Sequence, residues 1–594
     1  MKRTALLPVL GAFLFGPPRA AEACGGFFCN NQPIDQAGEK ILFIVDEDGG
    51  EVTAHIQIQY AGEASDFSWV VPVVAPPTFD VGSDEIFTRL LPPTTPVHRV
   101  ESSSRGNCNP CPSGADADAD SDGDIDYDTD TQTDSDSGGG VEILDTGIVG
   151  PFETVTLASD DPAALETWLV ENGYDVPATA GPIIAAYVSA DFYFVGLKLT
   201  KDAETGDLRP IVLHVPTTTP CIPLRLTAIA ATPDMPVYAW VLGDSRAVST
   251  NYYDVVPNDV LIFGGVLDYP EAAKAAIDAA GGRAFVTDFA GASSDYRYTM
   301  ESAYDTDRFR TFTTPWEVMD EMRSQGFLGS QLVMAILLEH MPPPDGVEPR
   351  DFYNSPSDYV DGTYTFDVNA LADALEDGIA RPLREVHEAF VAFDTLTRLY
   401  TVISPSEMTE DPEFAMNPDA PDVEIMRTAT VVRDCRNTIS SLDDYGDATT
   451  DAGHRFCGTD VRAGWGGYYG YYGGQTISGL DEVPLPALER AVLFGASGTG
   501  EVVVDEGDAI DDALRCDVPE PDDSVTECPD PYGGDADADG DADTDGDGDA
   551  DGATSGNGTL CAAVPGSGGS QAALLLTLMA LVLVLRGGSR RTPL

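Results

Sequence analysis

The sequence predicts an α+β protein with a β-rich, sandwich-like N-terminal half, a following α-helical region and long acidic linkers. Short apolar runs bounded by Pro, Gly or Asp fill the first half of the 594-residue chain. Amphipathic helical patterns with start and stop signals occupy the region from 268 to 400. Two further segments carry aspartate at nearly every second position, a pattern that cannot form a core.

The strands are predicted first. Residues 39–62 contain two alternating apolar runs joined across Asp46–Gly50, which indicates a hairpin, and DFSWVVPVV at 66–74 indicates a third strand. An acidic insertion at 105–140 interrupts this β-rich region, which we bound at 24–267. Strand patterns then resume in five segments: 141–159, 191–200, 209–216, 223–232 and 235–243.

A short helix is predicted within the β-rich region. Ser159 or Asp160 can cap its N-terminus, and Leu165, Trp168 and Leu169 share one face.

A mainly helical region is predicted over 268–435, and a loop-rich region over 436–515. The helical patterns of the first region lie at 269–282, 314–326, 330–341, 367–378 and 381–400, and a strand pattern at 421–435 closes it. The loop-rich region contains the Gly/Tyr segment GWGGYYGYYGG at 464–474 and a strand pair near Leu493–Val504. So much glycine favours a mobile surface loop over a platform for stacking sugars.

Residues 1–23 have the features of a secretory signal peptide. Lys2 and Arg3 precede an apolar run, and the small residues around Glu22 match a cleavage site, so the mature chain is predicted to begin at Cys24. Acylation of Cys24 is an alternative, but Glu22 stands where such signals have a small neutral residue.

Export predicts that most of the ten cysteines are paired. Local pairs cost the least loop-closure entropy. Such pairing would join Cys24 to Cys29, Cys108 to Cys111, Cys435 to Cys457 and Cys516 to Cys528, leaving Cys221 and Cys561 over, although other pairings stay open.

The net charge of −68 is not explained by the two aspartate tracts alone. The tracts at 116–136 and 535–551 hold ten and nine Asp, and the rest of the chain still has 81 acidic against 32 basic residues. Such a charge repels nucleic acid and anionic lipid, so we expect no nucleic acid and no other polyanion as a partner of the folded part.

The second tract lies in a predicted acidic linker, 516–571, and begins like a calcium-binding loop. Asp535, Asp537, Asp539 and Gly540 fit the first half of such a loop, but Gly546 stands where its last ligand, a Glu, belongs. We therefore predict an extended solvated linker, with no cofactor and at most weak calcium association.

The motifs of catalysis are missing from the sequence. It has no HExxH, GxSxG, GKS, GKT or strand-linked GxGxxG. His387 lies beside Glu385 and Glu388 at spacings that do not suit ligands on one helix face, and Cys108 and Cys111 indicate a small disulfide loop rather than a redox or zinc site. We assign no catalytic, cofactor-binding or metal-binding residue, and the sequence leans against an enzyme without deciding it.

Two resemblances add to these patterns. ACGGFFC at 23–29, HIQIQYAGEASDFSWVVPV at 55–73, YFVGLKL at 193–199, LRPIVLHVP at 208–216 and PLRLTAIA at 223–230 are similar to a bacterial exported family called domain of unknown function 2330. This resemblance spans roughly residues 23–400, and it implies export and no activity.

The C-terminal segment 572–594 resembles the three-part sorting signals of myxobacterial and similar surface proteins. It has an apolar run at 572–585 followed by Arg586, Arg590 and Arg591, and Cys561 precedes it. The resemblance implies that Cys561 is the processing position and that the chain is anchored to the membrane at this end.

These observations predict an exported protein displayed at the cell surface. The membrane is its expected contact through the C-terminal segment, and a surface protein or glycan is an unidentified further partner. The leading function is a binding or structural module on an acidic stalk. The alternative is a secreted hydrolase whose site is assembled from scattered acidic residues.

Overall fold

The computed structural model describes residues 35–514 except for ten gaps. The gaps are 62–67, 106–140, 175, 201–208, 302–303, 328–330, 435–445, 459–460, 464–474 and 478–482. The chain divides into units Met1–Cys528 and Pro529–Leu594, and the description below concerns the first unit alone. The predicted signal peptide, both aspartate tracts, the Gly/Tyr segment and the C-terminal segment lie outside the described residues, as do the side chains of every cysteine except Cys221.

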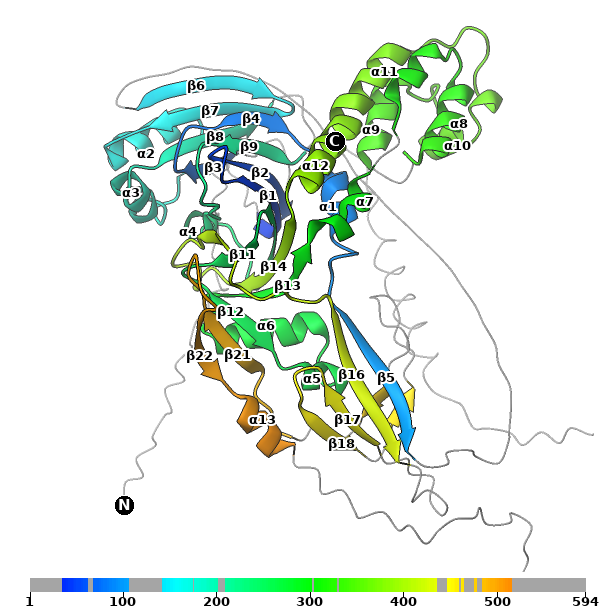
Figure 1. The fold of residues 1–594 in the computed structure, drawn as a ribbon. Helices are drawn as coiled ribbons and strands as arrows, with labels where there is room; N and C mark the ends of the chain where they lie inside the picture. Colours follow the sequence, from blue (N-terminus) through cyan, green and yellow to red (C-terminus); the bar gives the residue numbers. More distant parts are fainter. Residues whose placement is uncertain are drawn as a thin grey trace, which may run out of the picture. The chain divides into compact units, whose positions relative to one another are not determined.

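A mixed ten-stranded sheet runs through the unit in the order β22-β21-β12-β13-β14-β10-β1-β2-β9-β4 (Figure 1). Neighbouring strands are antiparallel except for the pairs β1–β10 and β12–β13. The strands are β1 (Asp35–Asp46), β2 (Glu51–Ala61), β4 (Thr78–Val81), β9 (Ile211–Val215), β10 (Met235–Gly243), β12 (Tyr253–Pro257), β13 (Ala284–Ala292), β14 (Thr395–Ile403), β21 (Leu488–Leu493) and β22 (Glu501–Asp505).

A four-stranded antiparallel sheet packs on one face of this large sheet. Its order is β3-β8-β7-β6, with β3 (Ser68–Val73), β8 (Tyr193–Leu199), β7 (Phe152–Ala158) and β6 (Glu142–Val149). Ile41 and Phe43 of β1 share one core with Trp69 and Val71 of β3, because alternate residues of a strand point to the same side. The two sheets therefore form the sandwich that the sequence predicts.

Helices cover the outer faces of both sheets. Leu42 of β1 and Trp240 of β10 point away from the sandwich and enter a second core with the helices on that side. These helices are α1 (Asp84–Leu90), α7 (Arg297–Met300), α8 (Pro315–Gln325), α9 (Gln331–His340), α10 (Pro349–Asn354), α11 (Val368–Leu375) and α12 (Arg381–Ala392).

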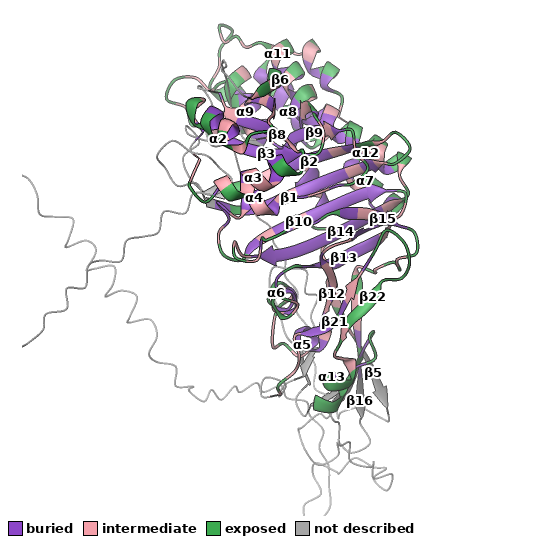
Figure 2. Cartoon of the chain, turned by 90° about the vertical axis from the view of Figure 1, so that its left-hand side faces the viewer, coloured by how far each residue is buried: buried purple, intermediate pink, exposed green. Residues whose placement is uncertain are grey.

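On the other side, α2 (Pro162–Glu171) and α3 (Gly181–Ser189) pack on the small sheet through Val70, Leu157 and Phe194. Covering both faces explains why β1, β10, β13 and β14 are buried along most of their length (Figure 2).

A further part of the unit adjoins the β12 end of the large sheet. Helix α6 (Tyr269–Ala279) packs on β12, β13 and β21. A second four-stranded sheet, in the order β18-β17-β16-β5, packs against α5 (Asp259–Phe263) and α13 (Gly507–Ala513). The strands of this second sheet are β5 (Val97–Arg105), β16 (Met426–Asp434), β17 (Gly446–Thr450) and β18 (Arg455–Gly458). The remaining described strands form two short pairs: β11 (Arg246–Ser249) with β15 (Phe414–Asn417), and β19 (Val461–Ala463) with β20 (Gln475–Ile477).

The structure confirms the α+β class and corrects three local predictions. The predicted strand at 223–232 is mostly the short helix α4 (Leu224–Thr227) followed by turns. The helix predicted over 381–400 ends at Ala392, where Phe393 turns extended, and Thr395 to Tyr400 belong to strand β14. Asp161, rather than Ser159 or Asp160, caps α2 through a side-chain hydrogen bond from the Ala163 amide.

Candidate functional site

An apolar cleft opens between the two sheets of the sandwich. The space between its walls is about 570 Å³, which includes space open to solvent. Phe43, Ala54 and Leu213 of the large sheet form one wall, and Val71 and Val73 of the small sheet form the other. We call this the Asp411 cleft, after the one charged side chain among its described lining residues.

The polar end of the Asp411 cleft is built by two loop segments held together through their backbones. The amide of Ile222 donates to the Pro412 carbonyl at 3.2 Å, and the amide of Phe414 donates to the Pro220 carbonyl at 2.9 Å. Thr217, Thr219 and Cys221 lie on the first segment and line the cleft with Asp411 of the second. Pro220 has no N–H of its own, and its carbonyl accepts from the second segment.

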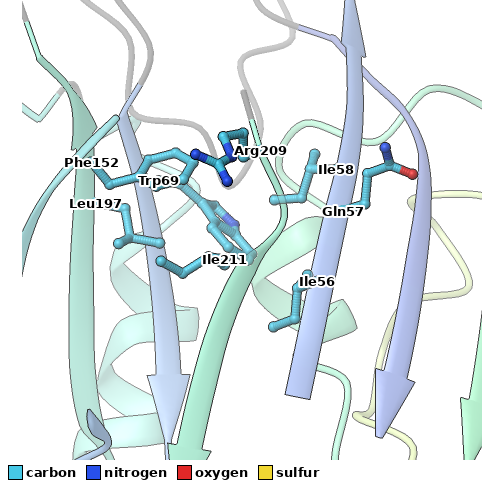
Figure 3. A pocket seen from close by; sticks show the side chains of 8 residues that line it. All are labelled: Ile56, Gln57, Ile58, Trp69, Phe152, Leu197, Arg209 and Ile211. Carbon is cyan, nitrogen blue, oxygen red and sulfur yellow. The ribbon is translucent and has the colours of Figure 1, made fainter. Parts of the chain in front are cut away.

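A second, smaller pocket lies between the same two sheets and shares Ile56 with the Asp411 cleft. It has a volume of about 330 Å³, part of it open to solvent. In Figure 3, Ile56 and Ile58 face Trp69 and Ile211 below the Arg209 guanidinium, whereas the Gln57 amide points to the other side of its strand. The space between the sheets is therefore apolar inside, with a basic residue at this end.

The ionisable groups of the Asp411 cleft are not arranged for nucleophilic catalysis. Burial, with the nearby charges of Asp411 and Glu413, raises the pKa of the Cys221 thiol, so it stays a neutral thiol at pH 7. Burial likewise raises the pKa of Asp411, against the hydrogen bonds from Tyr187 and the Arg225 amide that lower it. A single carboxylate beside a protonated thiol lacks both the activated nucleophile and its base.

A buried ion pair lies on the other face of the large sheet. The Nε of Arg398 is 2.9 Å from Oδ2 of Asp288, and both side chains are almost fully buried. Arg398 Nη1 also donates to the hydroxyls of Thr94 and Thr95, and Tyr269 donates to Asp288. This cluster joins the segment after α1 to β13 and β14, and we assign it a structural role because each buried charge has a partner of opposite charge beside it.

The structure does not bring the sequence-selected polar residues into a site. His387 is half-buried on α12 with Nδ1 3.3 Å from the carbonyl oxygen of Arg297, Glu385 lies 3.3 Å from Arg381, and Glu388 is exposed. Cys108 and Cys111 lie outside the described residues. Within the part of the chain that the structure describes, no three His, Cys, Asp or Glu side chains are grouped to hold a metal ion, and no helix has the length and apolarity to cross a membrane.

The sequence analysis did not find the Asp411 cleft. Its walls come from segments far apart in the chain, and no local motif joins Phe43, Val71, Leu213 and Asp411. The one signal was Cys221, which the cysteine count left without a local partner.

Fold and cleft together define a class of protein: an α+β protein whose β-sandwich, covered by helices, opens into an apolar cleft. Residues 18–415 match the model of a family described as an uncharacterized protein conserved in bacteria (DUF2330). Since the match covers about two thirds of the chain, the protein belongs to this family. Every lining residue of the Asp411 cleft lies inside the matched range. No curated protein and no solved structure matches the chain.

Proposed function

We propose that this protein is an exported, cell-surface binding module that holds a small apolar molecule in the Asp411 cleft. The observation that carries the proposal is the cleft itself: apolar walls from both sheets with a few polar groups at one end, which is the usual composition of a small-molecule site. Export and surface display are supported by the sequence patterns at 1–23 and 572–594.

The chemistry at the cleft favours binding over the hydrolase alternative. A hydrolase would need a nucleophile or a metal-bound water with a base beside it. The Asp411 cleft offers a neutral thiol and one carboxylate. Apolar walls, by contrast, gain free energy from any apolar ligand that displaces water from them, at about 25 cal/mol per Å².

A neutral solvatochromic dye such as Nile red tests the proposal on the full-length protein. We expect saturable binding with about one site per chain, because the cleft is a single space of limited volume. The substitution Ala54→Phe places a ring inside the cleft, since Ala54 is buried in its wall, and should weaken dye binding at least tenfold.

The matched control is Val391→Phe, because Val391 is 62% exposed on α12 and does not line the cleft. Cooperative thermal unfolding of both variants shows that each is folded. Equal dye affinity in the wild type and Ala54→Phe, or no saturable binding at all, would rule out the cleft as the binding site.

A further inference from the structure

The polar end of the Asp411 cleft has one acidic side chain and no basic one. Among the described lining residues, Asp411 is the one with a carboxyl group, and none is Lys, Arg or His. The other polar groups are neutral: the hydroxyls of Thr217 and Thr219 and the thiol of Cys221. A ligand whose apolar part lies between the sheets therefore places its end beside Asp411.

Asp411 is held in place by contacts from three directions. The Tyr187 hydroxyl donates to Oδ2 at 2.6 Å, the Arg225 amide donates to Oδ1 at 2.8 Å, and the Asn251 side-chain amide donates to the Asp411 carbonyl at 2.7 Å. Each carboxylate oxygen has two acceptor sites and uses one of them. The carboxylate is thus fixed and keeps capacity for a donor on the ligand.

Nearby charges of both signs act on Asp411. The Arg225 guanidinium, 5.2 Å from the Tyr187 ring centroid, lowers the pKa of Asp411 through its positive charge, whereas Arg283 is paired with Glu410. Glu413 adds a further negative charge close to Asp411. The chain as a whole has a net charge of −68, so a carboxylate or phosphate end is repelled at long range as well.

We infer that the ligand of the Asp411 cleft is a cationic amphiphile: an apolar body between the sheets with an ammonium or similar basic end that pairs with Asp411. This inference rests on the proposed binding function and narrows the class of ligand. An ammonium donates to the free acceptor sites of the carboxylate, and the hydroxyls of Thr217 and Thr219 can accept its remaining protons. An acyl chain ending in a carboxylate would meet Asp411 with the same charge.

Three probes of equal chain length separate the classes by displacing the neutral dye: octylamine, octanol and octanoate at pH 7. The charge-assisted hydrogen bond predicts that octylamine displaces the dye at roughly tenfold lower concentration than octanol, and that octanoate is the weakest. In Asp411→Asn the ratio between octylamine and octanol should fall to about one. The matched control Asp278→Asn, at an exposed carboxylate outside the cleft, should keep the wild-type ratio.

Raising the salt concentration gives a second measurement that needs no variant. Because salt screens a partly exposed ion pair, octylamine should lose its advantage between 50 mM and 1 M NaCl while octanol changes little. If the dye binds but octylamine shows no preference over octanol, or if octanoate binds tighter, the cationic ligand is wrong and the binding function stands. If the dye does not bind, the proposed function fails, and this inference fails with it.

Discussion

Arg398 carries its charge in the centre of the protein, on the helix-covered face of the large sheet. Its side chain is 2% exposed, and its partner Asp288 is fully buried. Burying a single charge costs desolvation free energy that nothing repays. In a buried ion pair, the attraction between the two charges offsets much of that cost. The planar guanidinium also reaches several acceptors at once, which explains why an arginine serves here.

Replacing Arg398 with Met should therefore destabilise the protein by about 3–5 kcal/mol, because Asp288 would stay buried without its partner. Urea unfolding followed by circular dichroism measures the loss. The control is Arg310→Met, because Arg310 makes its ion pairs with Asp307 and Asp373 in solvent and should matter little. If the two substitutions lowered stability equally, the buried ion pair would contribute no more to stability than the exposed pairs of Arg310.

Glu39 gives the protein a pH-dependent stability. Burial raises the pKa of Glu39 to about 7 from an ordinary 4.5, and the Gln36 side chain donates to it at 3.3 Å. Between these two values the folded chain holds a proton that the unfolded chain has lost. The free energy of unfolding should therefore fall by about 1.4 kcal/mol per pH unit as the pH rises through this window, and level off above it, where Glu39 is ionised in both states.

The variant Glu39→Gln isolates this effect. It lacks the titrating group, so its stability relative to the wild type should improve by about 1.4 kcal/mol per unit between pH 5 and 7. Urea unfolding of both proteins at several pH values gives the comparison, with exposed Glu47→Gln as the control. Parallel pH profiles for the wild type and Glu39→Gln would contradict the raised pKa.

At the scale of elements, the sequence predicted correctly those helix ends that residues close in the chain determine. Asp268 and Glu271 form a capping box at the start of α6, and Gly281 follows its end with a φ of 84°, as the sequence predicts for 269–282. Where a prediction was wrong, contacts with distant parts of the chain explain the difference. The apolar pattern at 381–400 continues without a break, but Thr395 to Ile403 pairs between β10 and β13, so pairing with the sheet ends the helix.

The cap of α2 offers a direct test at this scale. The sequence allows Ser159 or Asp160, but the structure assigns the cap to Asp161, whose carboxylate accepts from the Ala163 amide at 2.9 Å. Asp161→Ala should lower stability by about 1 kcal/mol, whereas Asp160→Ala should have little effect. Thermal unfolding of the two variants distinguishes the two candidate caps. A larger loss of stability in Asp160→Ala than in Asp161→Ala would make Asp160 the cap.

At the scale of the whole molecule, the candidate site shows what a sequence alone cannot provide. The strands β1, β2, β3 and β9 were predicted individually, because apolar runs and turn residues are local. Their arrangement into two facing sheets, and the meeting of Cys221 with Asp411 at the cleft, depend on contacts between residues nearly 200 positions apart. The apolar pattern of an individual β-strand does not specify which distant segment it will lie beside.

The proposed surface display also belongs to the whole molecule. The apolar run 572–585 would expose a large hydrophobic area to water, at a cost of about 25 cal/mol per Å², and Arg586, Arg590 and Arg591 oppose transfer of this end across a membrane. Both effects favour retention at the membrane. The acidic residues before the run carry the same sign as an anionic cell surface and should keep the folded unit away from it.

Deleting residues 572–594 should therefore release intact protein from the cell into the medium, as measured by fractionation and immunoblotting. The control is Cys24→Ser in the full-length chain, which removes the acylation site and should leave the protein with the membrane. Dye binding by the released protein should equal that of the full-length chain, since every described residue that lines the cleft lies well before 572. If the truncated protein stays with the membrane fraction and Cys24→Ser is released instead, the anchor is a lipid on Cys24, and the C-terminal segment has another role.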